Sequence, residues 1–209
     1  MLVKDVMKRP VITTGPEATL AEAHRLMWEQ GIRHLPVVDQ GGLVGIVTDR
    51  DIRLATSHLR PDPLPCDARV YQVMKRPVLT ADPLDPVEEA ARLMRAERVG
   101  CLPVVEGRDL VGIITGVDLL DALIVLTGAS HPAGRIEVVL PDRPGELARL
   151  TAFFAERGLN IHSVLTYPSD GGRVTTVLRV EALNTQRLAD ELRGLGFEVV
   201  WPPEKPWSR

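Results

Sequence analysis

The sequence predicts an α+β protein in which a strand–helix–strand–strand–helix unit occurs twice and a smaller β-α-β-β-α-β domain follows. Shifting the chain by 67 residues places 24 of the 50 residues in 3–52 on identical residues of 70–119, and the segments "VMKRPV" and "LPVV" recur intact. Such self-similarity indicates a duplication, so both copies are expected to share one fold. The order of elements after residue 135 predicts the last domain.

Each copy is expected to begin with an extended segment, "PVIT" (10–13) or "PVLT" (77–80), and to continue as a helix after Pro16 or Pro83. Thr19 followed by Glu22 is a good N-terminal capping pair for the first helix. Two apolar strands joined by a tight turn come next, and a second helix begins at a Thr-x-x-Asp stretch. Apolar residues recur at helical spacing on one face of the first helix: Leu20, Ala23, Leu26 and Met27 in copy one, and Val87, Ala90, Leu93 and Met94 in copy two.

The stretches "GIVTDRD" (45–51) and "GIITGVD" (112–118) admit two interpretations. Threonine followed by aspartate three residues later can cap the helix and needs no ligand. The same residues can hold a nucleotide, because a helix start attracts phosphate and a carboxylate accepts hydrogen bonds from ribose hydroxyls. The glycine is expected to let a flat ring approach the backbone. Retention of all three residues in both copies favours the functional interpretation.

The C-terminal part predicts four strands and two helices in the ferredoxin-like order. The first helix is expected to turn Leu147, Leu150, Phe153 and Phe154 inward, and the second to start at Asn184 or Thr185 and end at Gly194 or Gly196. The predicted boundaries are 1–60 and 61–126 for the two repeats, 127–135 for a linker and 136–203 for the last domain.

Composition excludes several classes of protein. A net charge of −3 favours neither nucleic acid nor anionic membranes as partners, so the short basic pairs Lys8–Arg9 and Lys75–Arg76 are expected to be solvated surface. No apolar run is long enough to span a membrane. Two distant cysteines, Cys66 and Cys101, fit a cytoplasmic protein. No metal-ligand spacing, nucleophile–base pair or phosphate-binding loop is present, so we expect no catalysis, no metal and no required cofactor.

The two copies, each with "LPVV" and Gly-h-h-Thr-x-x-Asp (h, apolar), resemble a tandem pair of cystathionine-β-synthase (CBS) domains, a Bateman module, over about the first 125 residues. The resemblance implies two clefts that bind adenosine nucleotides, each built from both copies. Cleft one would comprise Ile12, Thr13, Pro16, His34, Pro36, Thr115 and Asp118. Cleft two would comprise Leu79, Thr80, Pro83, Cys101, Pro103, Thr48, Arg50 and Asp51.

The clefts are expected to be unequal, because the cationic neighbours differ between the copies. His34 would support the first cleft and Arg50 the second, whereas copy two has Cys101 and Val117 at the equivalent positions. Partly buried packing is the alternative role for His34 and Cys101, and a solvated charge is the alternative for Arg50.

The stretch "DRPGEL" (142–147) followed by "GLNIHSV" (158–164) resembles an ACT domain, a small regulatory module that often binds amino acids where two copies pair. The resemblance places an effector site at Asp142 and Gly145, near where the second strand of the next chain begins, at Asn160. Several amino-acid-binding members carry a polar residue where this chain has Leu140, so a domain that only dimerises is the alternative.

A CBS pair followed by an ACT domain resembles the bacterial acetoin-utilisation regulator family. The expected function is non-catalytic sensing of AMP, ADP, ATP or S-adenosylmethionine, relayed through a homodimer to an unknown protein target. A regulatory subunit detached from an enzyme of the inosine monophosphate dehydrogenase type is one alternative, and a transcription-associated regulator is the other.

Overall fold

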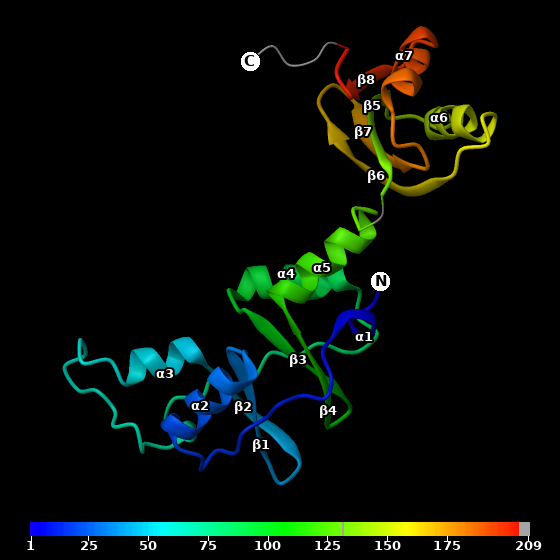
Figure 1. The fold of residues 1–209 in the computed structure, drawn as a ribbon. Coiled ribbons are helices and arrows are strands. Elements are labelled where there is room, and N and C mark those ends of the chain that lie inside the picture. Colours follow the sequence, from blue (N-terminus) through cyan, green and yellow to red (C-terminus); the bar gives the residue numbers. More distant parts are fainter. Residues whose placement is uncertain (131, 205–209) are drawn as a thin grey trace. The chain divides into compact units, whose positions relative to one another are not determined.

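The computed structural model describes residues 1–130 and 132–204, and the chain divides into two compact units (Figure 1). The first unit is Met1–Ala122 and contains both repeats except for the last four residues of the helix Gly116–Leu126, because the second unit begins at Leu123. No helix among the described residues is long and apolar enough to cross a membrane.

The two repeats have the same elements in the same order, as the duplication predicts. Their hairpins also share a register, since Pro36 faces Ile46 in one and Pro103 faces Ile113 in the other, and both contain a bulge at the equivalent position. Repeat one comprises α2 (Leu20–Gln30), β1 (His34–Asp39), β2 (Gly42–Thr48) and α3 (Asp49–Ala55). Repeat two comprises α4 (Val87–Glu97), β3 (Cys101–Glu106), β4 (Asp109–Thr115) and α5 (Gly116–Leu126).

The expected first strand of each repeat is shorter than predicted. Residues 10–13 and 77–80 form no regular strand, and the residue after each makes a single parallel bridge, Thr14 with Val37 in repeat one and Ala81 with Val104 in repeat two. Prolines precede and follow both segments, and proline has no N–H group to donate to a longer ladder. Each sheet therefore has two strands, with an extended segment beside it.

The segment that precedes each repeat packs into the core of the other repeat. Helix α1 (Val3–Val6) places Val3, fully buried, with Leu102 and Ile114 in the core of repeat two. The 3-10 helix η1 (Val70–Gln72) places Val70 with Leu35 in the core of repeat one. The repeat boundaries in the sequence therefore do not coincide with the cores.

The C-terminal domain has the predicted ferredoxin-like order, with a four-stranded antiparallel sheet in the order β6-β7-β5-β8. Its elements are β5 (Gly134–Pro141), α6 (Glu146–Ala155), β6 (Ile161–Ser169), β7 (Arg173–Val180), α7 (Gln186–Gly194) and β8 (Glu198–Trp201). Leu150, Phe153 and Phe154 are buried in its core, as predicted. The prediction for Leu147 is wrong: this side chain is 44% exposed, and Glu146 is buried beside it.

Helix α5 ends at Leu126 and β5 begins at Gly134, so residues 127–130, 132 and 133 of the predicted linker form no helix or strand, whereas its last two residues, 134 and 135, belong to β5. Within this linker, His131 lies outside the described residues.

Candidate functional site

Both Thr-x-x-Asp stretches form complete helix caps. The Asp51 N–H donates to Thr48 Oγ1 at 3.1 Å, and the Thr48 hydroxyl and N–H donate to Asp51 Oδ2 at 2.6 and 3.1 Å. Thr115 and Asp118 repeat this pattern, with the two bonds to Oδ2 at 2.7 and 2.8 Å. Capping is therefore a real role of these residues. It uses Oδ2 of each aspartate and directs Oδ1 elsewhere.

Each Oδ1 faces a lysine from the segment that precedes the other repeat. Lys8 Nζ lies 3.5 Å from Asp118 Oδ1, and Lys75 Nζ lies 3.4 Å from Asp51 Oδ1. The two aspartate side chains are only 3% and 12% exposed, whereas both lysine side chains are 69% exposed. Both lysine side chains are solvated, as predicted, but each also approaches a carboxylate that is largely shielded from solvent. Lys8 and Asp118 are 110 positions apart and Lys75 and Asp51 are 24 apart, so neither pair leaves a local signal in the sequence.

The glycines of the two motifs serve a purpose that differs from the predicted one. A Cβ atom at Gly45 would collide with the Met74 side chain, and a Cβ atom at Gly112 would collide with Met7. Glycine therefore admits a methionine of the opposite "VMKRPV" segment rather than a flat ring. The two repeated motifs contact each other crosswise, which explains why the duplication keeps both.

Two extended segments, called crossings below, each lead from one aspartate to the sheet of the other repeat. They are 8–14, which starts beside Asp118, and 75–81, which starts beside Asp51. Lys8 pairs with Ile113 of β4, and six residues later the Thr14 N–H donates to the Pro36 carbonyl at 3.1 Å. This segment carries Ile12 and Thr13, which the sequence assigns to cleft one.

The second crossing is equivalent to the first. Lys75 pairs with Ile46, and the Ala81 N–H donates to the Pro103 carbonyl at 3.0 Å. It carries Leu79 and Thr80, which the sequence assigns to cleft two. The prolines beyond the crossings bond to the short helices: the Pro16 carbonyl accepts from the Tyr71 N–H, and the Pro83 carbonyl accepts from the Lys4 N–H.

His34 lies where the two repeats meet. Its Nε2 sits so close to Gly100 that a Cβ atom there would be only 2.8 Å away. The Gly100 carbonyl accepts from the Gly116 N–H at the start of α5, so the imidazole is near the helix that holds Asp118. Burial, helped by Arg33, lowers the pKa of His34, and Asp51 opposes the shift. Burial therefore disfavours the charged imidazole in this structure, and the support of cleft one by His34 stays a prediction.

The remaining asymmetric positions differ in exposure. Cys101, the counterpart of His34, is buried, and burial raises the pKa of its thiol to about 12, so it carries no charge. Arg50 is exposed in the first turn of α3. Of these three side chains, Arg50 alone brings a positive charge at neutral pH.

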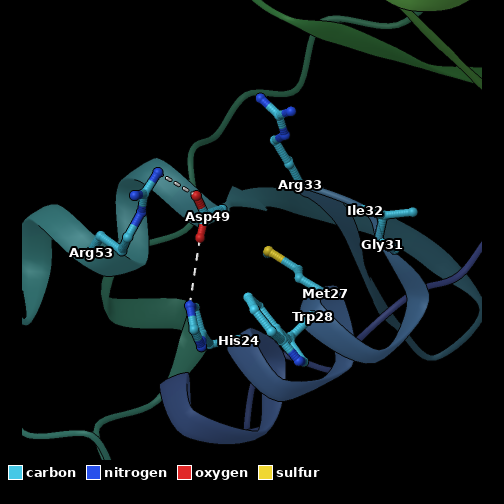
Figure 2. Close-up of a pocket in the computed structure, with 8 residues that line it drawn as sticks. All are labelled: His24, Met27, Trp28, Gly31, Ile32, Arg33, Asp49 and Arg53. Atoms are coloured by element: carbon cyan, nitrogen blue, oxygen red, sulfur yellow. Dashed lines mark ion pairs between the residues drawn. The ribbon is translucent and has the colours of Figure 1, made fainter.

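A groove of about 550 Å³ lies between α2 and α3 of repeat one. Figure 2 shows Asp49 between Arg53 and His24, with Met27 and Trp28 on α2 beside them. Arg53 Nη2 lies 2.5 Å from Asp49 Oδ2, and His24 Nε2 lies 3.5 Å from Asp49 Oδ1. The groove is lined by His24, Met27, Trp28, Gly31, Ile32, Arg33, Asp49 and Arg53. In repeat two, 67 positions later, the polar and aromatic lining residues are replaced by Ala91, Arg95, Gly100, Gly116 and Leu120, so this combination of lining residues is particular to repeat one. Sequence reasoning missed it, although these differences between the copies were a visible signal.

In the C-terminal domain, the three predicted effector residues do not converge within one chain. Asp142 and Gly145 precede α6, and Gly145 adopts a φ of +93° there. Asn160 follows α6 and lines a shallow hollow with Ala152 and Leu159. The length of a ten-residue helix, about 15 Å, therefore separates the two groups.

An unpredicted charged cluster lies at the start of α6. Glu146, nearly buried, accepts from Arg143 at 2.8 Å and forms an ion pair with Arg149 at 3.0 Å. The hydrogen bond from Arg143 lowers the pKa of the Glu146 carboxyl. Among the residues that the structure describes, no group of three or more His, Cys, Asp or Glu side chains could hold a metal ion.

Comparison with known proteins agrees with this architecture. Residues 3–58 and 70–125 match the family described as CBS domain, and residues 134–197 match the one described as ACT domain. A CBS domain-containing protein of Dictyostelium discoideum is 40% identical over 134 residues, which are 59% of this chain and 92% of that protein.

Two solved structures are similar to the repeat region. One is the CBS domain pair of protein MJ0100, in complex with 5-methylthioadenosine and S-adenosyl-L-methionine. It has a TM-score of 0.54 and is 32% identical, and the match covers 63% of this chain and 98% of the MJ0100 chain. The acetoin utilization protein AcuB of Vibrio cholerae has a TM-score of 0.55 and 35% identity, covering 62% and 95%. The matched repeats span more than half of the chain. This chain therefore belongs to the CBS domain family, as a tandem CBS pair followed by an ACT domain.

Proposed function

We propose that this protein is a non-catalytic regulator that senses adenosine nucleotides in two clefts, each built from both CBS repeats. The observation that carries this proposal is the pair of Thr-x-x-Asp caps at the starts of α3 and α5. Each cap uses only Oδ2 of its aspartate as an acceptor, so Oδ1 can accept hydrogen bonds from ribose. Each cap also lies at one end of a crossing segment that leads to the other repeat.

A similar solved CBS pair supports the choice of ligand, because it holds two adenosine compounds. We extend this to AMP, ADP, ATP and S-adenosylmethionine as candidate ligands of this chain. In cleft one, Asp118 would bind ribose beside Thr115, Ile12 and Thr13. In cleft two, Asp51 would do so beside Thr48, Leu79 and Thr80. Arg50 would add a cation to cleft two.

Calorimetric titration with AMP tests the proposal. Asp51→Ala and Asp118→Ala should each weaken one binding event by roughly tenfold or more, because hydrogen bonds to a charged group are lost. Glu22→Ala is the matched control. Glu22 forms the same kind of cap with Thr19, at 2.8 and 3.1 Å, but it caps α2 and is assigned to neither cleft. AMP affinity that changes in none of the variants would contradict the ribose assignment.

For the ACT domain, we propose an effector site that forms only when two chains pair. Gly145 and Asp142 of one chain would meet Asn160 of the other, because within one chain α6 separates them. Pairing without a ligand is the alternative. A thermal-shift screen with amino acids separates the two, since a ligand that binds only the folded state raises its melting temperature.

A further inference from the structure

We propose that Lys8 and Lys75 make the two clefts prefer adenosine compounds that carry a phosphate over the neutral nucleoside. This inference rests on the proposed nucleotide binding and gives a role to the lysine of each "VMKRPV" segment. It concerns selectivity: the two ammonium groups would decide which members of one ligand class bind.

The backbone of each lysine is fixed by hydrogen bonds to a strand of the opposite repeat. The Lys8 N–H donates to the Ile113 carbonyl at 2.8 Å, and the Ile113 N–H returns a bond to the Lys8 carbonyl at 3.2 Å. Lys75 exchanges the same two bonds with Ile46, at 2.8 and 3.1 Å. The preceding methionines fill the space above Gly112 and Gly45, which holds both segments in place.

The ammonium group of each lysine is only weakly bound to its aspartate. The distances of 3.5 and 3.4 Å between Nζ and Oδ1 exceed the usual length of a charge-assisted hydrogen bond, about 2.7–2.9 Å. With 69% of each side chain exposed, water screens the attraction. An anchored backbone with a mobile ammonium group lets the charge move without any change in the fold.

The two carboxylates cannot move in the same way. Each carboxylate accepts two hydrogen bonds at Oδ2 from its capping threonine, and the backbone N–H of the aspartate donates a third to the threonine hydroxyl. A ribose that binds Oδ1 must therefore take the place of the ammonium group. The ammonium group then lies next to the ligand and has lost its direct contact with the carboxylate.

The charge of the ligand determines whether this displacement is favourable. A neutral nucleoside leaves the displaced ammonium group without a partner, and so it competes with the lysine for the carboxylate. A nucleotide brings a phosphate, which offers the ammonium group a new charged partner within reach of its flexible stem. The lysine therefore opposes binding of the nucleoside and supports binding of the nucleotide. Because the arrangement occurs in both repeats, both clefts should show this preference.

Titration of wild type and variants with AMP and with adenosine tests the inference. Wild type should bind AMP more tightly, and the ratio of the two affinities should fall by about tenfold or more in the double variant Lys8→Met, Lys75→Met, which keeps the side-chain length and removes the charge. Adenosine affinity should stay equal or increase. Lys8→Arg with Lys75→Arg should retain the AMP preference, because the charge is kept.

Lys4→Met is the matched control, because it removes an exposed lysine from α1 of the same segment and should leave the ratio unchanged. A ratio that is the same in wild type and in the double methionine variant would overturn this inference while leaving nucleotide binding intact. Failure of the wild type to bind either compound would overturn the proposed function itself, and this inference with it.

Discussion

At the scale of single residues, the caps at Thr48 and Thr115 could be predicted from the sequence, whereas the lysines beside them could not. A cap depends on residues three positions apart, so its signal is local. The contact of Lys8 with Asp118 depends on the register of a backbone pairing between distant segments. The charge of His34 could not be predicted either, because burial at the junction of the repeats determines it.

His34 gives a prediction about pH. Its pKa in the folded protein lies below the ordinary value of 6.5, so the unfolded chain binds the proton first as pH falls. Stability therefore decreases as pH falls below about 6.5 and is unaffected by this group at higher pH. His34→Gln should lose less stability than wild type between pH 7.5 and pH 5, measured by urea unfolding. His58→Gln removes an exposed histidine as the control. Equal losses in wild type and His34→Gln would contradict the assignment.

At the scale of elements, helical spacing predicted α2 and α4 with their buried faces, and the paired apolar runs predicted both hairpins. The first strands were predicted too long, because periodicity does not register the missing donors of the flanking prolines. The packing of α1 and η1 against the opposite repeats was not predicted, since two repeats with the same elements and similar cores offer each short helix two comparable partners. Sequence similarity alone does not distinguish these partners.

The packing of α1 and η1 into the cores of the opposite repeats can be tested with a pair of core substitutions. Val3→Ala should loosen repeat two, and Val70→Ala should loosen repeat one, although each residue precedes the other repeat in the sequence. Removing two methyl groups from a fully buried site should cost about 1–3 kcal/mol. Hydrogen exchange should quicken mainly at β3 and β4 in the first variant and at β1 and β2 in the second. The reverse assignment of the two effects would show that each helix packs with its own repeat.

At the scale of the whole molecule, the sequence predicted both domain types, because each is signalled by a motif within one short stretch. Assembly is not signalled in this way, and it has to be argued from surface chemistry. Helix α5 exposes an apolar surface in the single chain, with Val117 at 66% and Leu120 at 61% exposed. Isolated exposed apolar residues are ordinary, but adjacent ones on a helix mark an interaction surface.

We therefore predict a homodimer in solution, in which α5 contributes to the contact between chains. Closed twofold pairing is the commonest way in which identical chains bury such a surface. Leu120→Asp should shift the protein toward the monomer by placing a charge in the apolar contact, as measured by light scattering across a range of micromolar concentrations. Leu59→Asp, which changes an equally apolar residue that is 84% exposed outside any helix, should leave the mass unchanged. A monomeric wild type would rule out the dimer, and with it an effector site that needs Asn160 from a second chain. A dimer that persists in Leu120→Asp would place the contact on another surface.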